Sequence, residues 1–237
     1  MKRLLLISNS TNFGEGYLDH VMDAILERLG PIRRVLYVPF ALFDRDGYTR
    51  KARARLADEG IEVDGLTADA AGADQVARAA AIFVGGGNAF RLLNTVQRAG
   101  LVGPIRERVL GGMPYIGASA GINIAAPTIM TTNDMPIVEP ESFAALNLVP
   151  FQINPHYLDP IPGLRHTGET RELRLMEFLE ENDRLVVGLR EGSWLRVDGP
   201  SLHLEGKAAA RIFARGREPQ EVEPGAVLDH LLRLGAA

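Results

Sequence analysis

The sequence predicts an α/β protein in which a mostly parallel sheet is covered by helices on both faces. The first observation is that short apolar runs alternate with longer amphipathic stretches over the first two-thirds of the chain. Strands buried on both faces read as continuous apolar runs, and their alternation with helices is typical of a parallel sheet. The second observation is that the last third carries short apolar runs separated by turns with Gly, Asp and Pro. That pattern favours a small antiparallel C-terminal portion.

Taken in order, the elements of the first two-thirds follow from the spacing of apolar residues. Short apolar runs predict strands at 4–8, 34–39, 61–66, 81–84 and 113–117. Between and after them, helices are predicted at 17–29, 48–59, 74–80, 89–99, 102–110 and 120–126. In the first of these helices Leu18, Val21, Met22, Ile25 and Leu29 recur at helical spacing, which gives it an apolar face.

The last third begins with a helix predicted at 169–182, where Leu173, Met176 and Leu179 share one face. Strands are predicted at 185–189, 193–197, 201–204 and 211–214, and a short helix is predicted at 227–234. No internal repeat, low-complexity tract or linker interrupts the sequence. Residues 1–237 are therefore interpreted as one domain.

The order of these elements also predicts where a ligand binds. In open α/β sheets, ligands lie beyond the carboxyl ends of the strands. We therefore expect the loops after Ser8, Pro39, Val84 and Gly117 to face one site.

Composition excludes several classes of protein. Lys and Arg number 26 and Asp and Glu number 30, for a net charge of −4, which disfavours a nucleic-acid-binding protein. The 237 residues include no Cys, so disulfides and thiolate catalysis are excluded. The apolar run near the N-terminus stops at Ser8, too early for a signal peptide, and no stretch approaches the about 20 apolar residues of a membrane helix. We expect a soluble cytoplasmic protein that does not bind membranes.

The most specific motif is G-x-S-x-G, present as Gly117-Ala118-Ser119-Ala120-Gly121. It lies between a predicted strand and a predicted helix, which is the context of a nucleophile elbow. The glycines allow close backbone approach, and the helix N-terminus favours negative charge that develops nearby. Ser119 is therefore the predicted nucleophile, against the alternative of an incidental serine in a tight turn.

A nucleophilic serine needs a base, and of the five histidines His156 has the most suitable context, directly after a short apolar strand. An acid must orient that histidine, and two are candidates. Asp134 would give the chain order Ser, Asp, His, whereas Glu191 would give Ser, His, Glu. Spacing alone does not choose between them, although the strand-end position of Glu191 favours it.

The oxyanion of the tetrahedral intermediate needs two donors, for which backbone N–H groups are suited. Ala120, directly after the nucleophile, is expected to supply one. The loop Gly85-Gly86-Gly87-Asn88 follows another strand and is expected to supply the second, from Gly87. A phosphate-binding loop is the alternative, but the glycines lack the G-x-G-x-x-G spacing and no Walker A motif occurs.

These motifs together resemble the peptidase E family. The matching blocks are Ile7-Ser8-Asn9-Ser10-Thr11, Val84-Gly85-Gly86-Gly87-Asn88, Gly117-Ala118-Ser119-Ala120-Gly121, Thr131-Thr132-Asn133-Asp134-Met135-Pro136-Ile137-Val138, Gln152-Ile153-Asn154-Pro155-His156 and Gly168-Glu169-Thr170-Arg171-Glu172. They follow one another in the family's order, and the resemblance extends to about residue 197. Peptidase E enzymes are α-aspartyl dipeptidases, serine peptidases that cleave dipeptides with an N-terminal aspartate.

The resemblance implies a fold like the class I glutamine amidotransferase domain, with Ser in place of the Cys of those enzymes. It implies Ser119 as nucleophile and His156 as base, and it ties both Asp134 and Glu191 to the charge relay. One departure is Ala118, where the family often has Trp. That difference puts fine specificity in doubt more than the chemistry.

An aspartyl substrate needs a fixed cation, which the guanidinium fork of Arg171 can supply, with Asn88 as a neutral donor beside it. The alternative for Arg171 is a surface arginine paired with a nearby Glu. The acid that does not orient His156 is a candidate for the substrate's α-amine. No metal motif such as H-E-x-x-H occurs, and neither metal nor cofactor is expected.

The sequence thus predicts a serine exopeptidase of Asp-X dipeptides, with a small peptide as its partner and an acyl-enzyme as its intermediate. A first alternative is a cyanophycinase-like hydrolase of β-aspartyl-arginine, whose cationic substrate side chain would favour acidic residues at the position of Arg171. A second is a non-catalytic small-molecule-binding domain on the same fold, which would not need Ser119, His156 and an acid together. The sequence does not predict the oligomeric state.

Overall fold

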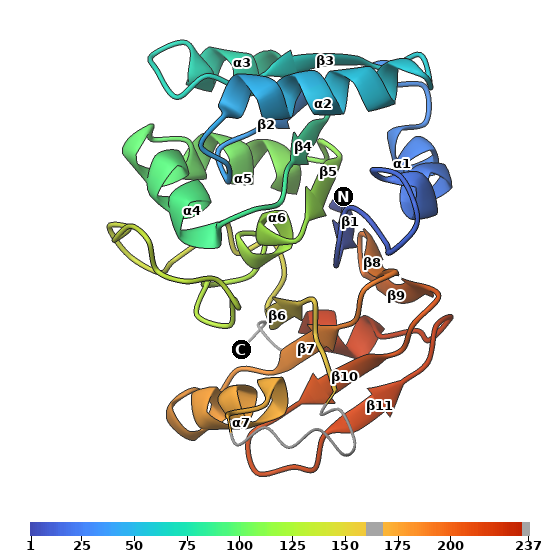
Figure 1. The fold of residues 1–237 in the computed structure, drawn as a ribbon, viewed down its shortest axis with the longest axis vertical. Helices are drawn as coiled ribbons and strands as arrows, with labels where there is room; N and C mark the ends of the chain where they lie inside the picture. Colours follow the sequence, from blue (N-terminus) through green and yellow to red (C-terminus); the bar gives the residue numbers. More distant parts are fainter. Residues whose placement is uncertain (160–167, 234–237) are drawn as a thin grey trace.

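The largest element of the computed structural model, which describes residues 1–159 and 168–233, is a seven-stranded sheet (Figure 1). Its strands are β1 (Arg3–Ile7), β2 (Arg34–Val38), β3 (Glu62–Gly65), β4 (Ile82–Val84), β5 (Tyr115–Ala118), β8 (Ser193–Asp198) and β9 (Ser201–Gly206). They lie in the order β3-β2-β4-β5-β1-β8-β9. The first five are parallel, whereas β8 and β9 are antiparallel to their neighbours. The sheet is therefore mostly parallel, which confirms the predicted fold class.

Helices cover both faces of this sheet, because alternate residues of each strand point to opposite sides. Leu5 and Ile7 of β1 belong to the hydrophobic cluster packed against α1 (Met22–Leu29) and α2 (Arg45–Ala57). Leu4 and Leu6 belong to the cluster formed with α3 (Gly72–Arg78), α4 (Ala89–Arg98) and α5 (Val102–Leu110). All four β1 side chains are buried, which explains why the strand reads as an unbroken apolar run.

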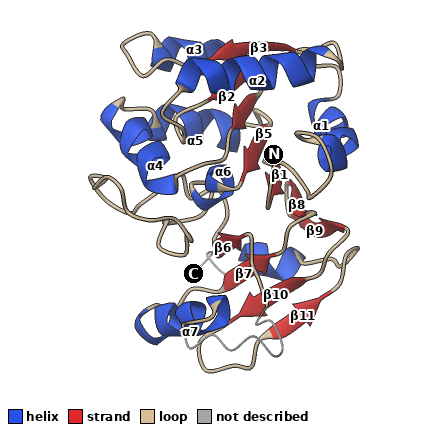
Figure 2. Ribbon diagram, viewed as in Figure 1, coloured by secondary structure: helices blue, strands red, loops and turns tan. Residues whose placement is uncertain are grey.

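A second sheet of four strands lies below the first in Figures 1 and 2. It contains β11 (Gln220–Val222), β10 (Ala210–Phe213), β7 (Val186–Leu189) and β6 (Gln152–Pro155) in that order, and α7 (Arg171–Glu181) packs against it. The predicted antiparallel C-terminal strands are thus divided between two sheets, because β8 pairs with the open edge of β1. The pairing of β6 with β7 is parallel.

Several element boundaries differ from the prediction for identifiable reasons. Leu18 has φ +66, so the first helix starts as the 3-10 turn η1 (Asp19–Val21) before α1. Helix α6 (Ala120–Asn123) stops before residue 126, because the segment 146–148 donates hydrogen bonds to the carbonyls of residues 124–126. Strand β11 lacks an apolar run and was not predicted. At the C-terminus the described helix is η2 (Asp229–Arg233), and Leu234 of the predicted helix lies outside the described residues.

Apolar side chains from both sheets belong to the same hydrophobic cluster. It contains Leu4 and Leu6 of the large sheet together with Ile153, Val187 and Ile212 of the small one. This shared cluster packs the two sheets against each other. It also joins the end of β6 to α6, which follows β5, and these two elements are in contact.

Candidate active site

Ser119 occupies a sharp turn between β5 and α6, with φ +52 and ψ −112. L-residues seldom adopt a positive φ, and such strained positions are concentrated at functional sites. The flanking glycines make the turn possible: a Cβ on Gly121 would lie 2.4 Å from the carbonyl oxygen of Val84, and one on Gly117 would lie 2.7 Å from that of Gly121. The G-x-S-x-G motif therefore has the physical basis that was predicted, close approach of backbone to backbone.

His156 lies directly after β6 and also has a positive φ, +51. Its Nε2 is 2.8 Å from the Oγ of Ser119, within hydrogen-bond distance. Ser119 and His156 come from different sheets, and each has an unusual backbone conformation. The structure thus brings the predicted nucleophile and the predicted base into contact at the junction between the two sheets.

Glu191 completes this arrangement on the other side of the histidine ring. Its Oε1 is 2.6 Å from the Nδ1 of His156, and the Glu191 side chain is half exposed. The residue follows β7, and the parallel register pairs Pro155 with Leu189, so the chain just beyond both strands meets at one edge. A carboxylate in this position holds the imidazole so that Nε2 can accept the proton of the serine hydroxyl.

Asp134 lies at the N-terminus of α4. Its Oδ2 accepts hydrogen bonds from the N–H of Ala89, at 2.7 Å, and from the hydroxyl of Thr132, at 3.1 Å. A carboxylate there compensates the unpaired N–H groups and the positive end of the helix dipole. Within the described part of the chain, it has no hydrogen bond to His156. Of the two acids that the sequence offered, Glu191 is thus the one that contacts the histidine.

The glycine loop after β4 lies directly against Ser119. A Cβ on Gly86 would lie 3.0 Å from the Cβ of Ser119, so the loop can pass this close only without a side chain. Gly87 has φ +130. Among the described residues, the N–H groups of Gly87 and Ala120 have no acceptor. Both predicted oxyanion donors are therefore unpaired within the part of the chain that the structure describes.

Arg171 and Asn88 differ in their surroundings. Arg171 begins α7, and the residues described around it include no hydrogen-bond or ion-pair partner for its guanidinium. Burial lowers its pKa, the neighbouring Arg174 lowers it further, and the charge of Asp134 opposes both. The Oδ1 of Asn88 accepts a hydrogen bond from the N–H of Arg91, at 3.0 Å, and its Nδ2 donates one to a loop carbonyl at 2.9 Å. Asn88 is thus mainly a helix cap, with one N–H left to donate.

Two further residues bear on the site. Ala118, the departure from the family pattern, is fully buried in the cluster that covers one face of the sheet. It therefore influences a pocket only through packing.

Tyr48 of α2 was not predicted as a site residue, because a single Tyr in a helix gives no indication of function. Its ring packs against the glycine loop, where a Cβ on Gly85 would lie 2.7 Å from its Cε1. Burial raises the pKa of Tyr48.

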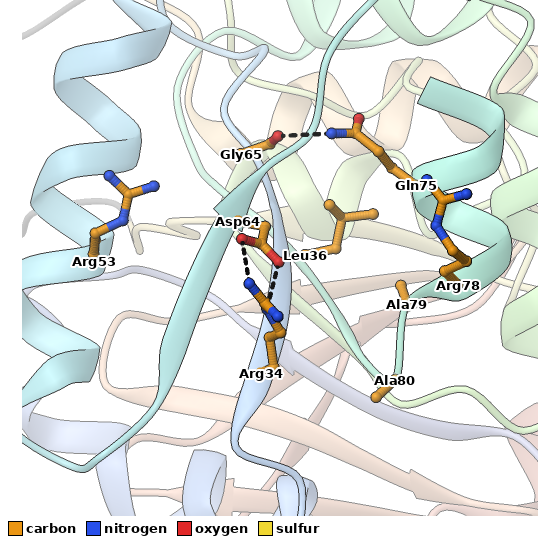
Figure 3. A pocket seen from close by; sticks show the side chains of 9 residues that line it. All are labelled: Arg34, Leu36, Arg53, Asp64, Gly65, Gln75, Arg78, Ala79 and Ala80. Carbon is orange, nitrogen blue, oxygen red and sulfur yellow. Dashed lines mark hydrogen bonds and ion pairs between the residues drawn. The ribbon is translucent and has the colours of Figure 1, made fainter. Parts of the chain in front are cut away.

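A hollow of about 460 Å³ lies away from this site, beside the edge strand β3 (Figure 3). Arg34 forms an ion pair with Asp64 at 2.7 Å, and Gln75 donates a hydrogen bond to the carbonyl of Gly65. None of the residues that line it belongs to the predicted site.

In residues 1–159 and 168–233, no group of three or more His, Cys, Asp or Glu is placed to hold a metal ion. In the same residues, no helix is long and apolar enough to cross a membrane.

Comparison with known proteins identifies the family. The model of peptidase family S51 matches residues 4–205. Peptidase E from Streptomyces coelicolor is 57% identical over 232 residues, which are 97% of this chain and 94% of that protein. A probable alpha-aspartyl dipeptidase from Drosophila melanogaster is 46% identical over 98% of both chains. Peptidase E from Escherichia coli is 43% identical over 94% of this chain and 98% of the other.

Solved structures share the fold at lower identity. A putative peptidase E from Listeria monocytogenes superimposes with a TM-score of 0.66 at 24% identity, covering 88% of this chain and 100% of the other. A peptidase from an acI-B1 actinobacterium gives a TM-score of 0.71 at 19% identity, covering 96% of both. From the matched span of the family model and the identity to full-length relatives, the chain belongs to peptidase family S51.

Proposed function

We propose that this protein is a serine exopeptidase that hydrolyses dipeptides with an N-terminal aspartate. The observation that carries the proposal is the continuous set of contacts from Ser119 through His156 to Glu191, at 2.8 Å and 2.6 Å. Relatives named peptidase E and probable alpha-aspartyl dipeptidase, at 43–57% identity over nearly their whole length, support the substrate class.

In the proposed mechanism, the Oγ of Ser119 attacks the carbonyl carbon of the aspartyl residue. His156 accepts the hydroxyl proton at Nε2 and returns it to the leaving amine, which yields an aspartyl-enzyme and a free amino acid. Glu191 fixes the ring and stabilises the imidazolium that forms. A water molecule, deprotonated by His156, then attacks the acyl carbon. The bond to the Oγ of Ser119 breaks, His156 returns the proton to that oxygen, and aspartate is released.

The negative oxygen of the tetrahedral intermediate is assigned to the N–H groups of Gly87 and Ala120. Backbone donors suit this task because they are already fixed before the charge develops. Their lack of other acceptors supports the assignment. The ring of Tyr48, packed against Gly85, supports the loop.

Substrate recognition is assigned to Arg171 and Asp134, two charged residues that interact electrostatically with each other. Arg171 is partly buried and has no ion-pair partner among residues 1–159 and 168–233, and it would bind the aspartyl side chain with its two-pronged guanidinium. Asp134, which is not engaged with His156, is the candidate for the substrate's α-ammonium group. Asn88 can add its remaining N–H.

The alternatives are less favoured. A cyanophycinase-like enzyme would have to bind a cationic side chain, whereas Arg171 presents a cation. A non-catalytic binding domain gives no reason for a strained serine and a strained histidine in contact. We also propose a cytoplasmic location, to be tested by cell fractionation.

Hydrolysis of a dipeptide panel tests the function. Purified protein is expected to cleave Asp-Leu and to discriminate strongly against Asn-Leu, which has nearly the same size but lacks the charge. Against Glu-Leu the discrimination should be weaker, about 1–3 kcal/mol for one methylene. Ser119→Ala is expected to lower kcat by several orders of magnitude while the protein stays folded. Cleavage of β-Asp-Leu in preference to Asp-Leu would support the alternative enzyme.

The role of Arg171 has a matched control one turn along the same helix. Arg174 forms an ion pair with Glu169 at 3.4 Å and is more than half exposed. Arg171→Ala is expected to lower kcat/KM for Asp-Leu and to reduce the preference for Asp-Leu over Asn-Leu. Arg171→Lys should recover little of that activity, because an ammonium group cannot make the paired hydrogen bonds of a guanidinium. Arg174→Ala should leave that preference unchanged. If Arg171→Ala lowers only the melting temperature, the residue is structural and this assignment is wrong.

A further inference from the structure

Ile7, Ser8 and Asn9, at the end of β1, each accept one backbone hydrogen bond near the proposed catalytic residues. The three donors are the N–H groups of Ser119, of His156 and of the residue after Glu191. The carbonyl of Ile7 accepts the N–H of Ser119 at 3.0 Å. The Oγ of Ser8 accepts the N–H of His156 at 2.9 Å.

The third bond comes from Asn9, whose Oδ1 accepts the N–H of Gly192, directly after Glu191, at 2.8 Å. The hydroxyl of Ser8 also donates to the carbonyl of Leu189, at 2.7 Å, so it bonds both strands that carry the histidine and the acid. A single segment therefore touches three chain positions that are otherwise far apart in the sequence.

The architecture makes such a link necessary. Ser119 belongs to the large sheet, whereas His156 and Glu191 follow β6 and β7 of the small sheet. The backbone of His156 is held at a positive φ, which persists only when neighbouring contacts determine it. Ser8 is 0% exposed and Asn9 1% exposed, so their hydrogen bonds are shielded from competing water.

We propose that Ser8 and Asn9 are positioning residues for the reaction: Ser8 holds His156 against Ser119, and Asn9 holds the turn that carries Glu191. Neither residue is assigned a contact with substrate. The inference rests on the proposed function, since it assigns these two side chains a part in the same site. It also explains the Ile7-Ser8-Asn9 block, to which the mechanism alone gives no role.

The first test compares two buried serines with the same kind of bonding. Ser8→Ala removes the acceptor of the His156 N–H and is expected to lower kcat for Asp-Leu by about 10- to 100-fold with KM nearly unchanged. Ser193 is the control, because its side chain is also fully buried and its hydroxyl makes a hydrogen bond in each direction, in the described residues to Ala208. Its carbonyl accepts the N–H of Ser8 at 3.0 Å, a backbone bond that a change to Ala leaves in place. Ser193→Ala should lower stability by a similar amount and keep kcat.

The second test is a double-mutant cycle between Asn9 and Glu191. Asn9→Ala alone is expected to lower kcat several-fold. In a Glu191→Ala background the same change should lower kcat no further, because no carboxylate remains to be positioned. If the two fold-losses simply multiply, Asn9 does not act through Glu191. This cycle does not depend on whether Ser8→Ala folds.

A third measurement, made without substrate, separates this inference from the proposed function. The proton shared by Nδ1 of His156 and Glu191 gives a far-downfield proton NMR resonance, assigned by its loss in Glu191→Ala. Wild type and Ser193→Ala should show it, whereas Ser8→Ala and Asn9→Ala should shift or broaden it. If wild type does not cleave Asp-Leu, the proposed function fails while this resonance still tests the positioning. A folded Ser8→Ala with wild-type kcat and resonance, or an equal loss in Ser193→Ala, overturns the inference.

Discussion

Replacing Glu191 by Ala and by Gln tests whether Glu191, and not Asp134, orients His156 and stabilises its protonated form. The imidazolium and carboxylate charges lie about 4 Å apart when the two groups are hydrogen-bonded, which corresponds to about 4 kcal/mol at an effective dielectric constant of 20 and about 1 kcal/mol in water. The side chains are 36% and 50% exposed, so an intermediate value of about 2–3 kcal/mol applies. Loss of that stabilisation in Glu191→Ala is expected to lower kcat roughly 30- to 160-fold.

The Gln variant should be worse than the Ala variant. An amide can donate its N–H to Nδ1 of His156, which places the ring proton on Nε2 and leaves no acceptor for the hydroxyl of Ser119. An acid-to-amide change of this kind costs about 10⁴-fold in a serine protease triad. The expected order of kcat is therefore wild type, Glu191→Ala, Glu191→Gln.

Asp134→Asn is the comparison variant. Its carboxylate bonds the start of α4 and has no hydrogen bond to His156 among the described residues, so the change should act mainly through KM, with kcat within a few-fold of wild type. The assay is the initial rate of leucine release from Asp-Leu over a range of concentrations, with circular dichroism to verify folding. Near-normal kcat in both Glu191 variants, together with a loss of about 100-fold or more in Asp134→Asn, would refute the reasoning.

Two further predictions concern packing and pH. Gly121→Ala places a Cβ 2.4 Å from the carbonyl oxygen of Val84, so α6 must shift; thermal melts should show a lower Tm and assays should show lost activity. Gly103→Ala, where a Cβ meets nothing within 4 Å, should leave activity intact, and equal behaviour of the two variants would contradict the packing argument. The hydrogen bonds from Arg28 lower the pKa of Asp198 to about 2, so Asp198→Asn should destabilise by about 1–2 kcal/mol after allowance for solvent screening. Because the folded-state pKa is the lower one, that contribution is complete above about pH 4 and is lost as pH falls through about 2, which denaturant titrations at several pH values can check.

Features that depend on residues close together in the chain could be predicted without the structure. Apolar runs such as Leu4–Ile7 predict buried strands because burial on both faces requires every side chain to be apolar. The elbow around Ser119 could be recognised because its two glycines lie within the same short motif as the serine. A Cβ at either glycine would clash with backbone oxygen, so both positions require glycine. Strand, turn and helix there follow within a few residues, so local spacing is sufficient.

Two features became visible only in the folded protein. They are the acid that contacts His156 and the pairing partner of β8. His156 and Glu191 are joined by the parallel register of β6 and β7, which aligns Pro155 with Leu189, and no spacing along the chain contains that register. In the same way, spacing does not show that β8 pairs with the edge strand β1 of the parallel sheet and does not join the other C-terminal strands in a separate sheet. The strand-end position of Glu191 favoured it, but spacing alone left Asp134 open, and the structure shows the Asp134 carboxylate bonded to the first N–H of α4. Pairing between distant strands depends on which edges and hydrogen-bonding groups remain unsatisfied once the chain has folded, and that is a property of the whole molecule.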